Sequence, residues 1–205
     1  MAAVEKLHII DPEDQARSDL YGFLGALLEK PADSKLLYQI SSLKPDDTPI
    51  GQSIHALSRI AGVTTAETAE REFNALFIGL GRGELLPYAS YYLTGFLNEK
   101  PLAKLREDMA ARHIARSVDN KQPEDNIASL MEMMGGMIVG RFGAVTSLTE
   151  QKTFFDTHIA LWAGHFFSDL EGSDSSVFYS AVGSLGRQFM EIESEAFRML
   201  GNDKN

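Results

Sequence analysis

The chain has 205 residues, of which 44% are hydrophobic and 23% charged, a composition typical of a folded globular protein with one large or two small domains. Its formal net charge of −10 argues against nucleic acid as a partner, because a negative surface repels phosphates, and favours a basic peptide or protein surface. With no cysteine in the sequence, disulfides, thiolate metal sites and cysteine nucleophiles are excluded.

Nothing in the sequence predicts a membrane segment or a secretory signal. The N-terminus lacks a basic region followed by an apolar one, and no apolar run reaches the ~18 residues that a membrane helix needs. We therefore expect a cytoplasmic protein without stable membrane insertion.

Helical patterns begin near the N-terminus. Asp11 is expected to cap a first helix that ends before Pro31, and two further helices are expected over residues 34–43 and 48–62. The Thr-Thr-Ala-Glu sequence at 64–67 has the form of a capping box and predicts the start of a fourth helix.

A glycine-rich loop and an aromatic stretch follow. Three glycines at alternate positions in residues 79–83 interrupt the helical pattern and predict a loop. Tyr88, Tyr92 and Phe96 then recur every four residues, which places them on one face of a short helix. Such aromatic residues either pack into the core or hold another chain, and both interpretations remain open from the sequence.

The second half of the chain continues the helical pattern. After a helix over residues 100–114, Glu124-Asp125 is expected to open a long apolar helix. The capping box at 147–150 predicts a helix that continues through Phe167, and the last helix begins at Phe178.

These patterns predict an all-α fold of roughly eight to ten helices, because no segment shows the alternation of a strand. We expect a single bundle-like domain over residues 1–205. The polar, aperiodic residues 116–123 predict a hinge between an N-terminal half, 1–115, and a C-terminal half, 124–205.

Two groups of polar residues could carry chemistry but are interpreted as structural. His158 and His165 would lie on one helix face with Trp162, but roughly 10 Å apart along the axis, too far to share a metal ion. The run Glu191, Glu193 and Glu195 is expected to form a solvated face.

The pair Glu124-Asp125 has two interpretations. Acids at a helix start stabilise the helix dipole by about 0.3–1 kcal/mol each. A carboxylate also matches an arginine guanidinium through two parallel hydrogen bonds, so the pair could bind an arginine of a partner.

Several short motifs occur in a characteristic order. They are, along the chain, Tyr21-Gly-Phe-Leu-Gly-Ala-Leu-Leu, Glu72-Phe-Asn-Ala-Leu-Phe, Pro87-Tyr-Ala-Ser-Tyr-Tyr-Leu, Pro101-Leu-Ala-Lys-Leu-Arg, His158-x-x-x-Trp, Phe166-Phe-Ser-Asp-Leu and Phe178-Tyr-Ser-Ala-Val. Together they resemble the TorD/DmsD-type chaperones, the redox-enzyme maturation proteins that serve molybdoenzymes.

The resemblance implies a helical cytoplasmic chaperone that is not an enzyme. It would bind the twin-arginine signal peptide and the apo form of the catalytic subunit of a molybdopterin-dependent oxidoreductase, supporting cofactor insertion and proofreading before export. It would keep no cofactor itself. Weak guanine-nucleotide binding and domain-swapped dimers occur among relatives, so the resemblance is compatible with either a monomer or a swapped homodimer.

The peptide-binding residues implied by the resemblance and by side-chain chemistry lie in two segments. They are Glu84, Leu86, Pro87, Tyr88, Ser90, Tyr92, Phe96, Gln122, Glu124, Asp125 and Asn126. Gln122 and Asn126 stand where the family motif has a glutamate and a histidine. Asparagine does not ionise near neutral pH, so a histidine-based pH dependence is not expected at this position.

Two other functions are compatible with the sequence. A helical scaffold or assembly factor for a non-exported molybdoenzyme subunit would bind its partner without reading a leader. A nucleotide-binding hydrolase would use the glycine loop with His158 or His165, but the loop lacks the Gly-Lys-Ser/Thr of a phosphate-binding loop.

Overall fold

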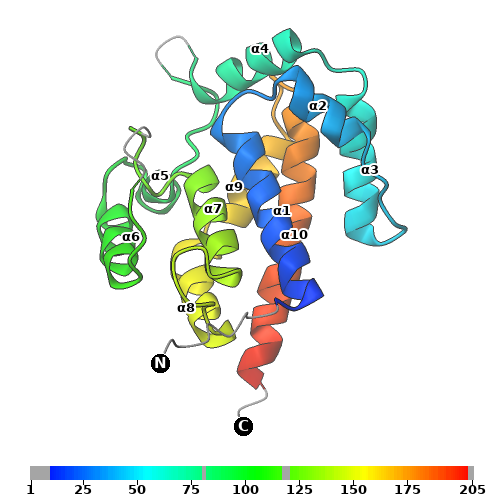
Figure 1. Cartoon of the computed structure of the whole chain (residues 1–205). Coiled ribbons are helices and arrows are strands. Elements are labelled where there is room, and N and C mark those ends of the chain that lie inside the picture. The colour runs from blue at the N-terminus through cyan, green and yellow to red at the C-terminus, as the bar shows by residue number, and fades with distance from the viewer. Residues whose placement is uncertain (1–9, 80–81, 117–120, 203–205) are drawn as a thin grey trace, which may run out of the picture.

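The computed structural model describes residues 10–79, 82–116 and 121–202, which form ten α-helices (Figure 1). The helices are α1 (Pro12–Glu29), α2 (Ser34–Ser41), α3 (Pro49–Ala61), α4 (Ala66–Phe77), α5 (Ala89–Thr94), α6 (Lys100–Ala111), α7 (Ile127–Ile138), α8 (Leu148–His158), α9 (Ala163–Glu171) and α10 (Phe178–Asn202). The described residues contain one isolated β-bridge and are otherwise helical or irregular, which confirms the predicted all-α class.

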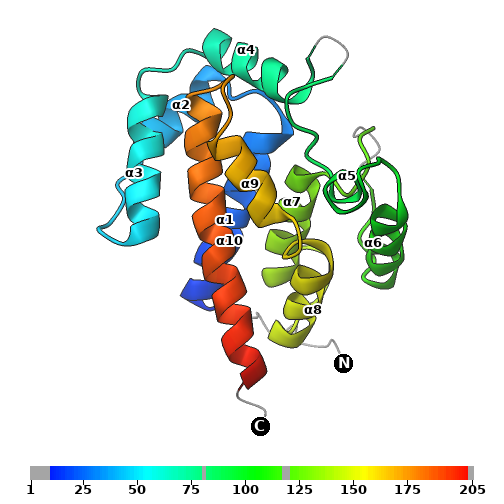
Figure 2. The same cartoon turned by 180° about the vertical axis from the view of Figure 1, so that it is seen from behind.

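The centre of the molecule is formed by α1, α7 and α10. Seen from behind, α10 runs between α3 and α9, while α5 and α6 lie on the far side of α7 (Figure 2). The buried core is rich in aromatic side chains, the largest of which are Trp162, Tyr21, Tyr179, Phe154, Phe155, Phe166, Phe167 and Phe178. Burial of these side chains is the main source of stability in the fold.

Small residues allow α1 and α7 to approach closely. A Cβ added at Gly25 would lie 3.3 Å from the carbonyl oxygen of Ala128, and one added at Gly135 would lie 3.1 Å from that of Ser18. The Ser18 hydroxyl also donates to the Gly135 carbonyl at 2.9 Å. The two helices are thereby held in antiparallel register, with the C-terminal part of α1 beside the first turns of α7.

The two predicted halves share one core in the described residues. Helix α1 packs against α7, and α3 packs against α10, so helices from both sides of the linker are interleaved. Residues 117–120 of the predicted hinge lie outside the described residues, and the division into halves stays a prediction.

Several predicted helix starts are confirmed. Asp11 and Thr48 cap α1 and α3, and Ser147 forms the predicted capping box with Glu150 at the start of α8. The cap of α4 is one residue later than predicted, because the Thr65 side chain accepts the hydrogen bond from the Thr68 N–H.

The prediction of one continuous helix from residue 147 through Phe167 is wrong. Helix α8 ends at His158 and α9 begins at Ala163. At this break the Trp162 indole donates to the His158 carbonyl at 2.8 Å, and the Ala160 N–H reaches back to the Phe155 carbonyl. As a result, His158 and His165 lie on different helices and do not share a face with Trp162.

The prediction for the acidic run on the last helix is wrong at one position. Glu191 and Glu195 are exposed, but Glu193 is 1% exposed and accepts hydrogen bonds from Arg17 and Tyr21 of α1. The neighbouring Ile192, although apolar, is 45% exposed. The last helix therefore turns a buried carboxylate toward α1.

The described helices include no candidate membrane span. None of them combines the length and the apolar character that crossing a membrane would require.

Candidate functional site

The aromatic motif and the segment before α7 meet in space, although about 35 residues separate them along the chain. Tyr88 and Asn126 form the isolated antiparallel bridge. The Ile127 N–H donates to the Pro87 carbonyl at 2.9 Å, and the Ala89 N–H donates to the Asp125 carbonyl at 3.0 Å. Six of the predicted site residues come together here, namely Pro87, Tyr88, Ser90, Gln122, Asp125 and Asn126.

Asp125 is fully buried and lies against the N-terminus of α5. Its Oδ2 accepts a hydrogen bond of 2.8 Å from the Ser90 N–H, while Tyr88, the N-cap residue of α5, makes no capping bond of its own. Asp125 thus caps α5 from another part of the chain. Its Oδ1 and the Ser90 hydroxyl are buried and have no hydrogen-bond partner among the described residues.

The prediction that Glu124-Asp125 opens the apolar helix is wrong, because the helix begins after both acids. Helix α7 begins at Ile127, and its cap is Asn126, whose Oδ1 accepts from the Ala128 N–H at 2.9 Å. The two acids precede the helix and make their contacts outside it.

Glu124 already binds arginines of its own chain. Its Oε2 accepts from Nε and Nη2 of Arg106 at 3.0 and 2.8 Å, and Arg116 lies 3.7 Å from Oε1. Burial alone would raise the pKa of Glu124, but its hydrogen bonds and the two guanidinium groups hold the pKa below its usual value. Glu124 is therefore ionised and paired near neutral pH.

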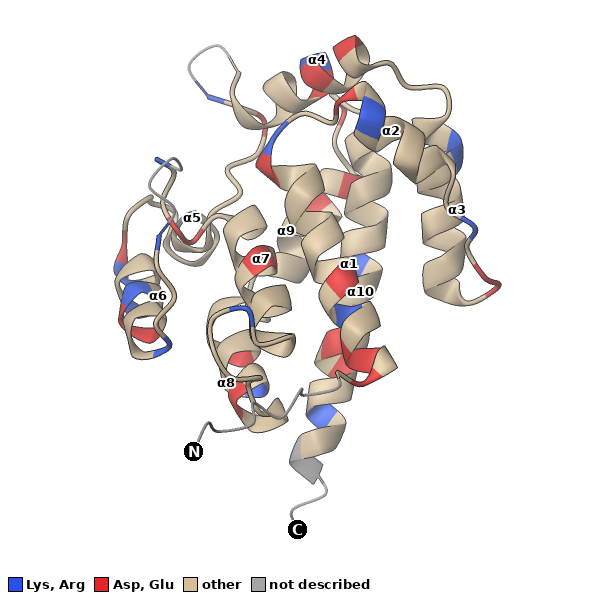
Figure 3. Ribbon diagram, in the orientation of Figure 1, with Lys and Arg blue, Asp and Glu red and all other residues tan. Residues whose placement is uncertain are grey.

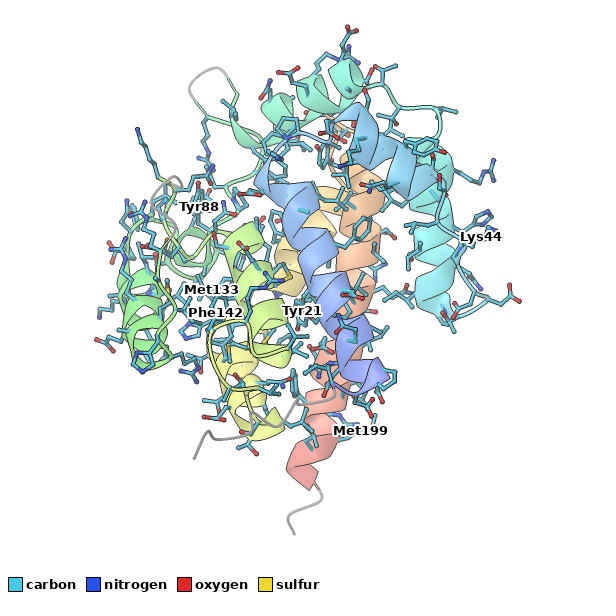
Figure 4. The ribbon with its side chains drawn as sticks, in the orientation of Figure 1. Tyr21, Lys44, Tyr88, Met133, Phe142 and Met199 are labelled. Carbon is cyan, nitrogen blue, oxygen red and sulfur yellow. The ribbon has the colours of Figure 1, made fainter. Side chains whose placement is uncertain are left out.

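The two amides that replace ionisable residues of the family motif form a neutral network. The Gln122 Oε1 accepts from the Tyr88 hydroxyl and from the Asn126 side-chain amide, both at 3.0 Å. Burial raises the pKa of Tyr88, which keeps its hydroxyl protonated as a donor. Figure 4 shows Tyr88 beside the segment that leads into α7.

The aromatic residues of the motif do not share one helix face, contrary to the prediction. Tyr88 precedes α5, and Phe96 follows its end at Gly95, whose φ of 81° turns the chain away. Tyr92 packs 5.3 Å from the Trp162 ring centroid and donates to Asp169 at 2.9 Å, whereas Phe96 is 69% exposed. Burial, assisted by Asp169, raises the pKa of Tyr92 well above its usual value.

Of the two remaining predicted residues, Glu84 contacts another part of the fold and Leu86 borders the network. The Glu84 Oε1 accepts from the Asp174 N–H at 3.3 Å, so this side chain faces the connection between α9 and α10. Leu86 is half-buried and directly precedes Pro87.

An open hollow of about 690 Å³ lies between α1 and α7, beside Gln122 and Asn126. It is lined by Gly22, Gly25, Ala26, Glu29, Lys30, Lys121, Gln122, Asn126, Ala128, Ser129, Glu132 and Arg141. We call it the α1–α7 hollow. Apart from Gln122 and Asn126, sequence reasoning missed these residues. The only sequence signal was the presence of small residues at positions 22, 25 and 26 of an otherwise bulky amphipathic helix.

The histidine region is structural. His158 is buried with its Nε2 2.7 Å from the Asp108 carboxylate, which joins α8 to α6. Within the part of the chain that the structure describes, no group of three His, Asp or Glu residues could hold a metal ion.

The structure defines an all-helical protein with a concave surface of about 690 Å³, a size typical of ligand pockets. The sequence model of the nitrate reductase delta subunit family matches residues 43–168, more than half of the chain. The chain belongs to this family, that of the TorD-type chaperones, which mature molybdoenzymes.

Individual relatives agree with this assignment. The chaperone protein TorD of Aliivibrio fischeri is 28% identical over 201 residues, covering 88% of this chain and 94% of the relative. TorD of Vibrio atlanticus is 27% identical, covering 89% and 94%. The fold is shared with a crystal structure from Archaeoglobus fulgidus described as a redox enzyme maturation protein, with a TM-score of 0.58, 19% identity and coverage of 92% and 99%.

These findings confirm the predicted family and the prediction that the chain is a chaperone rather than an enzyme. The hydrolase alternative loses its support accordingly.

Proposed function

We propose that this chaperone binds the twin-arginine leader of a molybdopterin-dependent oxidoreductase in the cytoplasm, holds the apoenzyme and releases it for export after cofactor insertion. The observation that carries the proposal is the α1–α7 hollow beside the bridge between Tyr88 and Asn126. The family assignment supports a redox enzyme as the client, and the hollow is a surface on which an extended peptide can lie.

The floor of the hollow suits close approach by a peptide backbone. Gly22 and Ala26 are exposed on α1, and no atom lies within 4 Å of a Cβ added at Gly22. Gln122, Asn126 and Ser129 add polar groups at its edge. Concave surfaces with convergent polar groups are typical of specific binding sites.

The first experiment is calorimetric titration with a panel of twin-arginine leader peptides, each beside a version with both arginines changed to glutamine. Micromolar or tighter binding that the change abolishes supports leader recognition and identifies the client. Absence of binding to every leader refutes the proposal and favours the scaffold alternative, in which the partner is held through its mature part.

A second experiment tests the location. An added Cβ at Gly22 has open space, so Gly22→Leu should project a side chain into the hollow and weaken leader binding while the melting temperature does not fall. Gly164→Leu is the matched control, because this α9 glycine also has no atom within 4 Å of an added Cβ but does not line the hollow. Equal binding by both variants would move the leader site elsewhere.

Guanine-nucleotide binding by this chain remains a second proposal at the same place. Lys30, Lys121 and Arg141 line the hollow and could contact phosphates. Titration with GDP and GTP, with and without leader peptide, tests this: competition would indicate one shared surface.

The oligomeric state, monomer or domain-swapped homodimer, is tested by light scattering.

A further inference from the structure

The two walls of the α1–α7 hollow each carry one carboxylate. Glu29 ends α1, and Glu132 lies in the second turn of α7. Both side chains are exposed, and acidic positions on these two helices are visible in Figure 3. Neither residue belongs to the set expected from the sequence motifs.

We propose that Glu29 and Glu132 are the specificity-determining residues that bind the two adjacent arginines of the leader, one from each wall. The inference rests on the proposed function, and it names the residues of that site that bind the positive charges of the leader.

The three acids expected from the sequence, Glu84, Glu124 and Asp125, make contacts elsewhere in the chain, Glu84 with the backbone of Asp174. Asp125 is fully buried and caps α5, and Glu124 is bound to Arg106 and Arg116. Inserting a leader arginine at either carboxylate would break contacts within the chaperone and cost stability. By contrast, Glu29 forms no ion pair with another described residue, so a guanidinium would gain a partner there without displacing one.

The placement on opposite walls fits an extended peptide. Successive side chains of an extended chain point in opposite directions, so two adjacent arginines reach two facing surfaces. A Cβ at Gly25 would lie 3.6 Å from the Glu132 backbone nitrogen, and Glu29 lies one turn further along α1, so the two carboxylates line the hollow from neighbouring helices and are offset along the helix axes. A peptide between the walls would therefore place one arginine toward each carboxylate.

Three cations also line the hollow and oppose the binding of arginines. Arg141 lies 3.7 Å from Glu132 in a pair whose side chains are 55% and 67% exposed, and Lys30 and Lys121 lie nearby. Such exposed pairs are weak. A leader arginine can replace Arg141 at Glu132, and neutralising Arg141 should then strengthen leader binding.

The test is a double-mutant cycle between chaperone and peptide. Glu29→Gln and Glu132→Gln should each weaken binding of the twin-arginine peptide roughly fivefold and leave binding of the glutamine peptide almost unchanged. Arg141→Gln should strengthen binding of the twin-arginine peptide. Glu70→Gln on α4 is the control, because it removes the same charge from an exposed helix position outside the hollow.

The outcomes separate this inference from the proposed function. If the wild-type chaperone binds no leader, the proposed function fails. If it binds leaders in an arginine-dependent way but the Glu29 and Glu132 variants behave like Glu70→Gln, only this inference is overturned. Equal weakening of both peptides by the two variants would also overturn it, because the carboxylates would then not sense the arginines.

Discussion

The buried carboxylate of Glu193 supplies the sharpest test of how this fold is held together. Its Oε1 and Oε2 accept hydrogen bonds of 2.8 Å from Nε and Nη2 of Arg17, and Oε2 also accepts from the Tyr21 hydroxyl at 2.9 Å. Burial and the Glu193 charge together raise the pKa of Tyr21, so the hydroxyl stays a donor. Figure 4 shows Tyr21 on the central helix α1.

We predict that Glu193→Gln lowers the free energy of unfolding by about 3 kcal/mol. Removing one partner of a buried ion pair costs roughly 3–5 kcal/mol, because the other charge stays buried without compensation. The low end applies since Arg17 keeps its contact with Asp14 at 2.8 Å and its side chain is 16% exposed. For a chain of this length the melting temperature should fall by roughly 6–12 °C.

The assay is urea and thermal unfolding followed by circular dichroism. Glu191→Gln, two residues earlier and exposed, should leave the melting temperature unchanged and serves as the control. The double variant Arg17→Met with Glu193→Leu should recover most of the lost stability, since an apolar pair removes the desolvated charge. If Glu193→Gln lowers the free energy of unfolding by less than about 1 kcal/mol, the buried ion pair is refuted as a source of stability. The Glu193 charge would then behave as a solvated one, as the sequence predicted.

Three further predictions concern other contacts. Asp125→Ala should lower the free energy of unfolding by about 1–2 kcal/mol, measured in urea, because the buried N-terminus of α5 loses its cap; unchanged stability would contradict the capping role. Burial lowers the pKa of His158 below its ordinary value of 6.5, so the unfolded chain takes up the proton first and stability should fall as the pH drops below about 6.5. In His158→Gln the loss of stability between about pH 7 and about pH 5, measured by chemical unfolding, should be smaller than in the wild-type chain. A pH profile of stability identical to that of the wild type would contradict this explanation. Gly183→Ala should lower the free energy of unfolding by about 1–3 kcal/mol, because the added Cβ would overlap the Glu171 backbone. Gly164→Ala has open space around its Cβ and should be neutral or stabilising in the same melting assay. The reverse order of stabilities would be inconsistent with the close packing of α9 and α10.

Local chemistry made most of the helices predictable. Asp11, Thr48 and Ser147 cap helices where expected, because a capping bond joins residues only two or three positions apart. The break after His158 was missed, since it depends on the Trp162 indole binding a backbone carbonyl, and the amphipathic pattern runs through the break without interruption.

The site was predictable only in part. The motif resemblance led to Tyr88, Gln122 and Asn126, which the structure brings into one hydrogen-bond network. It could not assign the acids: Asp125 and Glu124 differ from Glu29 only in what surrounds them once the helices pack.

The sequence by itself determined an acidic, all-helical chain, the positions of its main helix starts and its family. Those properties follow from composition and from interactions between near neighbours. Only the tertiary structure decided that Glu193 is buried, that Asp125 serves α5 and that a hollow opens between α1 and α7. The physical reason is that burial and concavity depend on which helix faces meet. The α1–α7 hollow opens where α1 carries the small residues Gly22, Gly25 and Ala26.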